Sequence, residues 1–498
     1  MPEISRGAHV THPHYGSGVV KALRHRGFEV LVSFSRFQLW VPARELTVVT
    51  QGLRLVTPVE TDASKPSEPP ARRSVTFEDI LKLLHRSAQK DQVPKPSKDR
   101  SPAATLPPPT VRPLPSGGSR TDAVDIEALR LGIVPLARIG SWTVGREMEA
   151  ARMRQFLLDD SEGAITIEGA YGAGKTHLLA YLAEQAARAG FAVAMAGFDP
   201  SEAAAAFPKR AYRRLVRGFL APVEGRRLDF RGFLRTLAEK DPKVLSDHWA
   251  FGPFLDLLRR GRVEEQDWAW IEGRNGGARA SFPTLHDHST CANLYCSLLS
   301  ALSRAGAEVL GLRGLVVLLD EAEVAKSVLY SYHFVRGLNF FRGLILTAND
   351  DPVLIEEKVV RGDFYSYGAE TGLLYSGHRP VRYTTGIPSL LKVAFALTPG
   401  TLRQELKQYR DTMDFVPLDP LPPADLRRLF GLICDRFAAV YGVRLTTRER
   451  EDVYRLVSQD SRVGSTREFI KGAVEALDGL RFYPAVPLAE VLAAGTAS

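Results

Sequence analysis

Apolar residues alternate between strand-like and helix-like spacings through the middle of the chain, from about residue 122 to residue 420. Ala164–Glu168, Leu315–Leu319 and Lys392–Leu397 are short apolar runs of the kind that a fully buried strand shows. Helical spacing follows the first run, over His177–Arg188. The alternation predicts an α/β domain built on a parallel sheet.

The remainder of the chain, residues 421–498, keeps helical spacing almost throughout. Thr446–Glu449 has the form of a capping box, and Arg467–Leu477 is amphipathic. We therefore expect a helical lid domain that follows the α/β domain.

Residues 1–57 have the short, β-rich runs of a small separate domain. His9–Val20 contains a glycine-punctuated turn, and Phe28–Phe34 and Leu39–Pro42 are further strands. The pattern predicts a five-stranded, SH3-like or Tudor-like β-barrel. Its residues resemble the Tudor-like domain of UvrD-type helicases and the RNA-polymerase-binding barrel of CarD-type regulators.

Residues 58–121, between these domains, are rich in Pro, Ser and Lys. Such a segment buries too little apolar surface to offset the entropy of ordering, so we expect a flexible linker. A capping box at Thr76–Asp79 opens a helical stripe, which predicts a short helix over residues 76–88. That helix would dock on a partner or pack on the chain's own α/β domain.

Composition favours a soluble, cytoplasmic protein. No stretch approaches the roughly 20 unbroken apolar residues of a membrane helix, and the first residues contain no apolar signal core. The chain has three cysteines, Cys291, Cys296 and Cys434, and a small, odd number argues against a disulfide framework.

His286 and His288 precede Cys291 and Cys296 closely enough to suggest a metal site. Their spacing matches no standard zinc pattern, and a second Cys/His pair is absent. We interpret them as ordinary buried thiols and surface histidines, with a metal site as the alternative.

The net charge of +8 and the pI of about 9.3 favour an anionic partner such as DNA, although an Arg-rich surface without a ligand gives the same balance. Two segments could make the contact. Lys209–Arg217 is basic and lies on an expected helix, and Tyr365–Tyr383 predicts a protruding hairpin whose aromatics could stack on bases. The alternatives are a solvated helix face and a hairpin that packs on a neighbouring subunit.

The strand Ala164–Glu168 leads into a complete G-x-x-x-x-G-K-[ST] loop, Gly169–Thr176, and a helix follows. Glycines let backbone amides turn toward phosphates, and the helix N-terminus adds its positive dipole end. We expect Lys175 to contact the β- and γ-phosphates of ATP and the Thr176 hydroxyl to bind Mg²⁺. The predicted nucleotide-binding residues are Gly169, Ala170, Tyr171, Gly172, Ala173, Gly174, Lys175, Thr176 and His177.

An acidic pair follows the buried run Leu315–Leu319. Asp320, at the carboxyl end of that strand, would lie beside the P-loop and hold Mg²⁺ together with Thr176. Glu321 would orient or deprotonate the attacking water, which predicts an ATPase rather than a kinase.

Two segments compete for the strand that carries a γ-phosphate sensor. Gly343–Asp350 looks strand-like, but a helical stripe runs straight into it from the N-terminal side. Lys392–Thr398 ends in a polar residue followed by a Pro-Gly break, so we assign the sensor role to Thr398. Thr347 and Asn349 remain the alternatives.

Five short sequence segments carry a further resemblance: Ala128–Pro135, Thr143–Glu147, the P-loop, Trp268–Gly273 and Leu318–Glu323. Together they resemble the BREX-system ATP-binding protein family of bacterial phage defence, over about residues 122–480. That family is similar to the origin-recognition branch of AAA+ ATPases. The resemblance implies a role in discriminating or excluding foreign DNA, beside a helicase or methyltransferase. Segment 361–391 and the N-terminal barrel depart from the family.

The resemblance also implies roles for single residues. In such ATPases the segment that holds Gly145 and Arg146 lies near the adenine and the ribose. Arg467 stands where a lid arginine senses the γ-phosphate, with a surface ion pair as the alternative.

An arginine finger would come from a neighbouring subunit of a homo-oligomer. Arg410, shortly before the strand Asp414–Leu418, is the candidate, and Arg361 and Arg382 remain open.

Two classes of function follow. In the first, a DNA-directed motor or loader couples ATP turnover to DNA engagement or to remodelling of a helicase. In the second, a nucleotide-controlled switch or adaptor hydrolyses slowly and recruits effectors through the barrel. A regulator bound to RNA polymerase is a third possibility. Glu321 favours the first class, since a pure switch needs no base that activates water.

Overall fold

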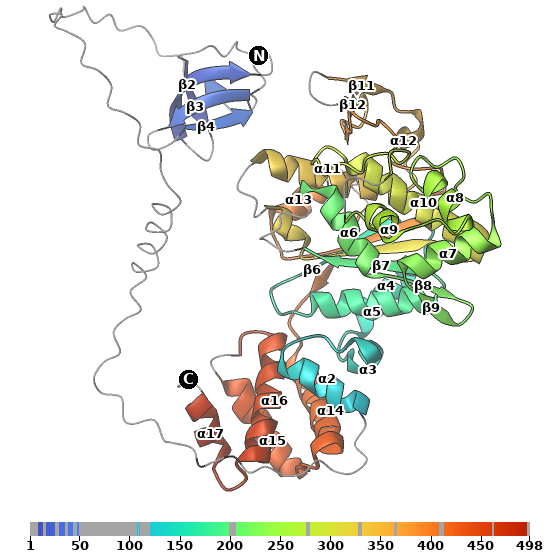
Figure 1. The fold of residues 1–498 in the computed structure, drawn as a ribbon. Helices are drawn as coiled ribbons and strands as arrows, with labels where there is room; N and C mark the ends of the chain where they lie inside the picture. The colour runs from blue at the N-terminus through green and yellow to red at the C-terminus, as the bar shows by residue number, and fades with distance from the viewer. Residues whose placement is uncertain are drawn as a thin grey trace, which may run out of the picture. The chain divides into compact units, whose positions relative to one another are not determined.

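The structure is a computed structural model of the chain, which divides into two compact units, Met1–Lys98 and Asp99–Ser498 (Figure 1). The described residues are 8–12, 16–24, 29–34, 38–42, 47–48, 107, 109, 120–198, 206–274, 279–326, 331–362, 366–407, 413–460 and 463–495. The expected helix over 76–88 and almost all of the expected linker lie outside them.

The first unit contains a five-stranded antiparallel sheet in the order β4-β3-β2-β1-β5. Its strands are β1 His9–His12, β2 Gly16–Arg24, β3 Glu29–Phe34, β4 Gln38–Pro42 and β5 Thr47–Val48. Val10, Val20 and Val32 are buried. The five strands agree with the expectation. No pairing joins β4 to β5 within the described residues, so closure into a barrel stays a prediction.

The second unit is built on a seven-stranded sheet whose first five strands, in spatial order, are parallel. The order is β15 Asp414–Leu418, β6 Ala164–Gly169, β14 Leu391–Leu397, β10 Leu315–Asp320, β7 Ala192–Gly197, β8 Phe219–Val223 and β9 Arg226–Leu228. Strand β14 therefore lies between β6, which precedes the P-loop, and β10, which ends in Asp320. The α/β fold with a parallel-rich central sheet that the sequence predicts is confirmed.

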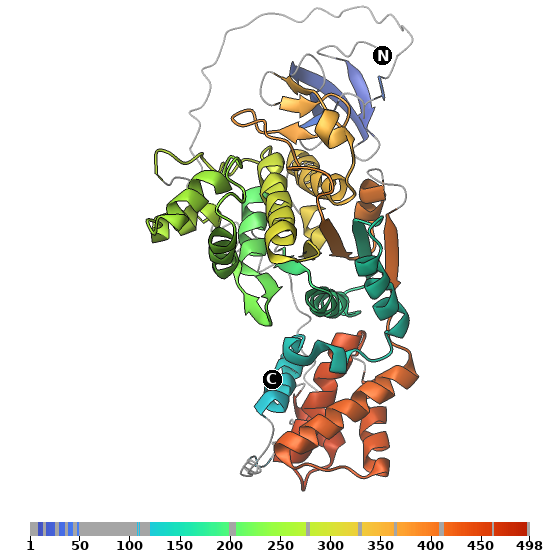
Figure 2. The same ribbon diagram turned by 90° about the vertical axis from the view of Figure 1, so that its right-hand side faces the viewer.

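Alternate residues of each strand face two different hydrophobic clusters. In β10, Leu315, Val317 and Leu319 belong to the cluster formed with α6 to α11, whereas Val316 and Leu318 belong to the cluster formed with α4 and α5. The sheet lies between these two groups of helices (Figures 1 and 2). The helices are α4 Glu147–Leu158, α5 Lys175–Arg188, α6 Pro208–Arg217, α7 Phe230–Lys240, α8 Phe251–Arg259, α9 Glu265–Ile271, α10 Ala292–Leu310 and α11 Ser331–Ala348. Helices cover both faces, which explains why the strands are apolar throughout.

A third hydrophobic cluster forms the predicted C-terminal lid. It joins α14 Pro423–Tyr441, α15 Thr447–Gln459, α16 Thr466–Phe482 and α17 Leu488–Gly495 to α2 Arg120–Arg130. Helix α2 contributes Ile126 and Leu129, and the Nε atom of Arg130 lies 2.7 Å from Oδ2 of Asp478 in α16. The lid therefore includes a helix from the start of the second unit, which the sequence did not indicate.

Short elements complete the second unit. They are the 3₁₀ helices η3 Leu136–Arg138 and η5 Ala322–Lys326, the helices α3 Ile139–Trp142, α12 Val353–Glu356 and α13 Thr401–Lys407, and the strands β11 Val359–Arg361, β12 Ser366–Gly368 and β13 Leu374–Tyr375. The run at Gly343–Asp350 is confirmed as the end of helix α11 rather than a strand.

The hairpin expected over Tyr365–Tyr383 is present as β12 and β13, but its proposed aromatic contacts are wrong in part. Tyr375 and Tyr383 are fully buried and meet edge to face, with ring centroids 5.1 Å apart. The Tyr375 hydroxyl donates to Glu357 at 2.8 Å, and the Asn339 amide donates to the Tyr383 hydroxyl at 2.8 Å. Both rings belong to the hydrophobic interior, where their hydroxyls are hydrogen-bonded. Because the rings are buried, they cannot stack on bases.

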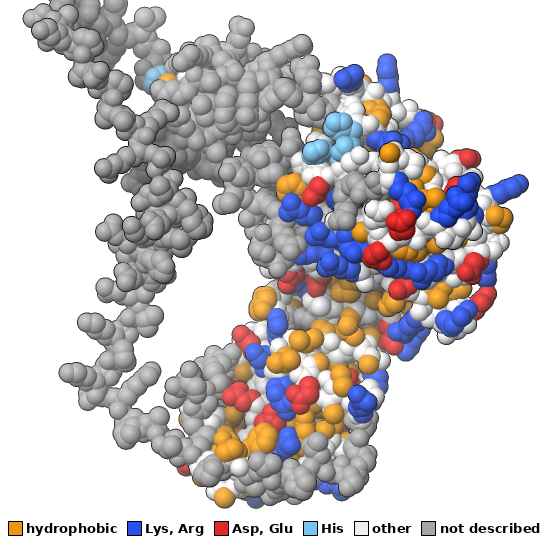
Figure 3. Space-filling model, viewed as in Figure 1, with side chains coloured by type: hydrophobic (Ala, Val, Ile, Leu, Met, Phe, Trp, Pro, Cys, Tyr) orange, Lys and Arg blue, Asp and Glu red, His pale blue; other side chains and the backbone are white. Residues whose placement is uncertain are grey.

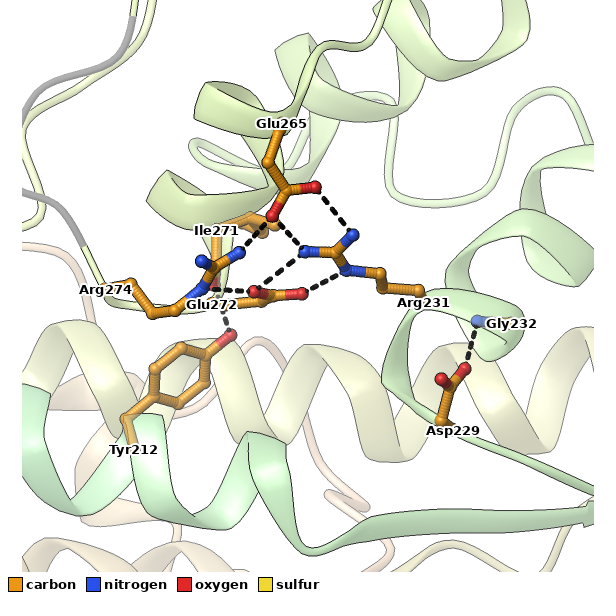
Figure 4. Close-up of polar contacts among 8 residues, drawn as sticks. All are labelled: Tyr212, Asp229, Arg231, Gly232, Glu265, Ile271, Glu272 and Arg274. Carbon is orange, nitrogen blue, oxygen red and sulfur yellow. Dashed lines mark hydrogen bonds and ion pairs between the residues drawn. The ribbon is translucent and has the colours of Figure 1, made fainter.

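The phrase Trp268–Gly273 forms most of α9 and the turn after it. Glu272 follows this helix, and Glu265 begins it. Arg231 forms ion pairs with Glu265 at 2.7 Å and with Glu272 at 2.5 Å, and Arg274 pairs with the same two residues at 2.6 and 2.7 Å, so the four side chains form a closed ring (Figure 4). The two arginines lower the pKa of Glu265 to about 2. Glu272, which belongs to this segment, therefore connects the end of α9 to α7 through Arg231 and to the following turn through Arg274.

Two expectations from composition can be compared with the structure. The three cysteine thiols, Cys291, Cys296 and Cys434, are free and buried. Among the described helices, none combines the length and the apolar character needed to cross a bilayer.

Replacing Gly314 with Ala should strongly destabilise the second unit. Gly314 has a φ of 137°, and a Cβ there would lie 1.9 Å from the Leu390 carbonyl oxygen, so β10 and β14 would have to separate. Gly311→Ala is a matched control, because Gly311 has a φ of 67° but open space around it. The loss of unfolding free energy in urea should exceed the roughly 1–2 kcal/mol that a left-handed backbone alone costs at Gly311. Equal losses would contradict this packing.

Candidate nucleotide-binding site

The polar groups of the site converge because parallel strands end at one edge of the sheet. The P-loop Gly169–Thr176 leaves β6, Asp320 ends β10, and Thr398 follows β14. These three strands are adjacent, with β14 in the centre. The structure therefore brings together the predicted P-loop, acidic and sensor residues.

The P-loop has the backbone that its glycines allow. Gly172 and Gly174 have φ values of 76° and 105°, and α5 begins directly after the loop at Lys175. The buried Lys175 ammonium donates to the carbonyl oxygens of Gly169, at 2.8 Å, and Ala170, at 3.2 Å. A phosphate chain held by the loop would bring its oxygens to the same ammonium group.

Asp320 and Thr176 form the pair expected to bind Mg²⁺. The Thr176 hydroxyl donates to Oδ2 of Asp320 at 2.7 Å, and the Glu321 backbone N–H donates to Oδ1 at 3.0 Å. Burial raises the pKa of the Asp320 carboxyl above its ordinary value, and the Thr176 hydrogen bond opposes the shift. A divalent cation beside this hydroxyl and carboxylate would offset the cost of burying the charge, so the pair fits Mg²⁺.

Glu321 is exposed and has a φ of 55°, in the left-handed region. That conformation costs a residue other than glycine about 1–3 kcal/mol and often occurs at functional sites. It turns the chain sharply after β10, so Glu321 follows the buried Asp320 at the surface of the same cavity.

Thr398 lies beside the P-loop lysine. Its hydroxyl oxygen is 3.2 Å from Nζ of Lys175 and donates to Oε1 of Glu323 at 2.5 Å. The other carboxylate oxygen of Glu323, Oε2, is buried and has no hydrogen-bond partner among the described residues. The position suits a γ-phosphate sensor, although the role itself stays a prediction.

The two alternative sensors lie elsewhere. Asn349 Oδ1 accepts a hydrogen bond from the backbone of Gly163, just before β6, at 3.0 Å. This is the amino end of the strand, away from the P-loop. Thr347 is buried nearby, and its Oγ1 atom has no hydrogen-bond partner within the described chain. None of the three candidates is among the cavity-lining residues, so the contact of Thr398 with the P-loop lysine is what distinguishes it.

A cavity of about 490 Å³ extends from the P-loop toward the lid. Its far end is lined by apolar side chains from the lid and from the segment between α2 and α4, among them Leu129, Ile133, Val134, Trp142, Leu429 and Ile470. A cavity with a phosphate-binding loop at one end and an apolar wall at the other suits a nucleotide whose base is buried.

Arg146 and His177 both line the cavity, but Arg146 also has a structural role. Its buried guanidinium donates to the carbonyl oxygens of Ala173, at 3.1 Å, and Asp419, at 2.6 Å. Burial, with a contribution from the Arg146 charge, lowers the pKa of His177 to about 4, so the imidazole is neutral at pH 7. Gly145 does not line the cavity. A Cβ there would meet Asp425 at 2.5 Å.

Arg467 connects the lid to the P-loop. Its guanidinium donates to the Tyr171 hydroxyl at 2.8 Å, and its backbone N–H donates to the Gly172 carbonyl at 3.3 Å. The predicted γ-phosphate sensor of the lid therefore stands at the cavity. Of the arginine-finger candidates, Arg410 lies outside the described residues, and Arg361 and Arg382 are exposed away from the cavity.

The sequence left two parts of this site unassigned. Leu129 and Ile133 belong to a phrase that carried the family resemblance, yet its place as an apolar wall depends on how α2 packs in the lid. Glu323 belongs to a second such phrase, and only the adjacency of β10 and β14 brings it to Thr398. The signals in the sequence were the apolar side chains of Leu129 and Ile133 and the acidic side chain of Glu323.

Residues 119–222 match the family model of the BREX system ATP-binding protein BrxC/D. The matched segment contains Arg146, the whole P-loop and α6, and it ends before Asp320. The match supports ATP binding, and the P-loop lies within the matched segment. No curated protein matches the chain.

The comparison with solved structures finds three assemblies to which parts of the chain are similar. A replication initiator DnaA bound to AMPPCP and single-stranded DNA is 12% identical, with a TM-score of 0.30 over 68% of this chain and 63% of that one. Drosophila ORC bound to DNA is 13% identical, with a TM-score of 0.34 over 84% and 74%. The HORMA:CdnC:Trip13 complex of E. coli MS115-1 is 10% identical, with a TM-score of 0.35 over 73% and 91%.

Asp320→Asn should remove the magnesium dependence of ATP binding while leaving the fold intact. The substitution keeps an oxygen that can accept from Thr176 but removes the negative charge that a cation needs. Equilibrium binding of a fluorescent ATP analogue, with magnesium or with a chelator, measures the effect. For the wild type we expect magnesium to tighten binding about tenfold, or about 1.4 kcal/mol. A variant that keeps the same magnesium effect would contradict the assignment of Asp320.

Thr398→Val should lower kcat for ATP by about 10–100-fold with little change in nucleotide affinity, because a hydroxyl aimed at the γ-phosphate acts mainly in the transition state. Thr347→Val is the matched control. It removes a buried hydroxyl that has no hydrogen-bond partner among the described residues, so turnover should stay within about twofold. Steady-state kinetics of both variants distinguish the two sensors, and the reverse result would assign the role to Thr347.

Proposed function

We propose that this chain hydrolyses ATP in a BREX-type defence system and couples the turnover to engaging DNA or to loading or remodelling a partner such as a helicase. The observation that carries the proposal is the convergence of Lys175, Thr176, Asp320, Glu321 and Thr398 at one sheet edge. The family match of residues 119–222 supports the defence setting.

Each side chain would have a separate task. Bound Mg²⁺–ATP supplies the phosphoanhydride bond and the charge of the ion at its phosphates. Lys175 neutralises developing charge on the β- and γ-phosphates, and Thr398 donates a hydrogen bond at the γ-phosphate. Glu321 orients the attacking water or accepts its proton, which its exposed position beside Asp320 supports.

The lid would report the state of the nucleotide. Arg467 lies on α16 and contacts Tyr171, whose ring stands 5.7 Å from the guanidinium and is 69% exposed. A γ-phosphate in the loop would compete with the tyrosine hydroxyl for this arginine, because a charged acceptor binds a guanidinium more strongly. Hydrolysis would then release the lid, and this movement could act on DNA, on a partner or on neighbouring copies.

The basic face of α6 supports DNA as the partner. Lys and Arg side chains gather over this helix in Figure 3. The basic run Lys209–Arg217 is confirmed as a helix. Lys209, however, does not lie on a solvated face of that helix. Its ammonium is buried and donates to the Leu285 carbonyl oxygen at 2.8 Å, and burial lowers its pKa.

Arg213 and Arg217 of the same helix line a cleft of about 350 Å³ with Arg231 and Arg274. The last two are ion-paired to glutamates, as Figure 4 shows. Neither Arg213 nor Arg217 has an ion-pair partner in the part of the chain that the structure describes, and Nε of Arg213 is buried without a hydrogen bond. Two uncompensated guanidinium groups at one cleft suit a phosphodiester backbone.

ATP hydrolysis by the full chain, measured with and without single- and double-stranded DNA, tests the proposal. We expect DNA to increase turnover several-fold. Lys175→Ala and Glu321→Gln should each reduce turnover by at least about 100-fold, since each removes a group that acts on the transition state. Glu321→Gln should still bind ATP, whereas Lys175→Ala should bind it weakly.

A double variant, Arg213→Ala with Arg217→Ala, is the control for the DNA surface. It should keep basal hydrolysis and lose the stimulation by DNA, with a smaller salt dependence of DNA binding. ATP binding with negligible turnover, unchanged by DNA or by Glu321→Gln, would contradict the proposal and favour the slow nucleotide switch.

A further inference from the structure

Three histidines from distant parts of the sequence meet on the surface of the second unit. His286 and His288 precede α10, and His378 follows β13. One ring nitrogen of each lies within 4.8 Å of those of the others, and the ring centroids are 4.5, 5.5 and 6.0 Å apart. Histidine side chains form a compact pale-blue patch on this face (Figure 3).

A buried amide holds the backbone around His378. The fully buried Asn293, in the first turn of α10, accepts a hydrogen bond from Ser376 N–H at 3.0 Å. Its Nδ2 atom donates to the carbonyl oxygens of Arg379, at 3.1 Å, and Val381, at 2.8 Å. One side chain thus fixes the loop on both sides of His378 against the helix that follows the other two histidines.

Two more buried side chains hold the backbone at His286. The Tyr295 hydroxyl donates to the His286 carbonyl oxygen at 2.6 Å, and the Lys209 ammonium donates to the Leu285 carbonyl oxygen at 2.8 Å. Buried polar groups are costly unless they are hydrogen-bonded, and these are used to position two loops. The histidines therefore stand on a preorganised backbone, as the ligands of a metal site do.

The imidazoles themselves have no hydrogen bond to any residue in the described ranges, and their contacts with rings are with one another. His288 and His378 are exposed and His286 is half-buried, so their nitrogens are accessible from solvent. Three imidazoles around one point are a ligand set for a divalent ion of the zinc type, with a fourth position left to water.

We propose that His286, His288 and His378 bind one divalent transition-metal ion of the zinc class, separate from the nucleotide site. Tetrahedral Zn²⁺ with Zn–N bonds of about 2.0–2.1 Å places ligand nitrogens roughly 3.4 Å apart. The present ligand atoms lie within 4.8 Å of one another, and the exposed side chains of His288 and His378 would rotate to close the remaining difference. The ion would link the segment after β13 to the loop before α10, and so fix the insertion-like segment 361–391 on the core of the unit.

This ligand set differs from the one that the sequence suggests. Cys291 and Cys296 are fully buried within α10 or at its start, and burial raises the pKa of each thiol above its ordinary value. Neither thiol belongs to the group of ligand atoms that come together at the surface. The third ligand is instead His378, which lies too far along the chain for any spacing pattern to indicate it.

The test is metal binding by the nucleotide-free full chain after removal of metal by chelation. Titration with Zn²⁺ by calorimetry, and with Co²⁺ by visible absorption, should show one equivalent bound through nitrogen and without a thiolate charge-transfer band. His378→Ala and His288→Ala should each weaken binding by more than the roughly 10–100-fold that loss of an outer-shell partner costs. Both side chains are exposed, so circular dichroism should stay unchanged.

Cys291→Ser is the matched control and should bind Zn²⁺ like the wild type. Asp320→Asn, which removes the carboxylate of the nucleotide site, should also keep the bound equivalent. Zn²⁺ should raise the Tm of the wild type but not that of His378→Ala, because an ion that binds only the folded state stabilises it. No bound equivalent in the wild type, or equal binding by the histidine variants, would overturn the proposal.

Discussion

Parallel strands end at a common edge, and the nucleotide site of this chain depends on that constraint. Strands β6, β14 and β10 are adjacent and parallel, so the P-loop, Thr398 and Asp320 leave the sheet side by side. The residues are up to 229 positions apart in sequence, between Gly169 and Thr398. Any shift of β14 out of its central place would separate Lys175 from Thr398, although neither side chain contributes to the core of the sheet.

The same edge concentrates polar groups that are costly to bury. Asp320 is 7% exposed, and burial raises the pKa of its carboxyl above its ordinary value. The hydroxyl of Thr176 and the backbone N–H of Glu321 satisfy its oxygens. The buried Lys175 ammonium is satisfied by loop carbonyls. A site of this kind is already arranged around charge, so little reorganisation accompanies the binding of a phosphate chain and its cation.

Local patterns in the sequence were sufficient for much of the fold and for naming the residues that the structure brings together at the candidate site. The helical spacing of apolar residues predicts α11, and the Pro-Gly break after Thr398 marks the end of strand β14. The P-loop and the acidic pair each follow a strand that an apolar run predicts. Patterns of this kind carry no information on which distant segments touch. The burial of Tyr375 and Tyr383, the place of α2 in the lid and the meeting of His378 with His286 all depend on such contacts. The unexpected burial of Lys209 has the same origin, because its partner is a carbonyl oxygen 76 positions away.

The packing of α2 against α16 joins two elements that both line the candidate nucleotide cavity. Leu129 of α2 belongs to the apolar wall at the base end, and Arg467 of α16 stands at the phosphate end. The ion pair between Arg130 and Asp478 ties the two helices together. A nucleotide that occupied the whole cavity would meet both helices, α2 near its base and α16 near its terminal phosphate. ADP or inorganic triphosphate would then leave one of the two helices without its contact, so the packed pair would favour the complete nucleotide.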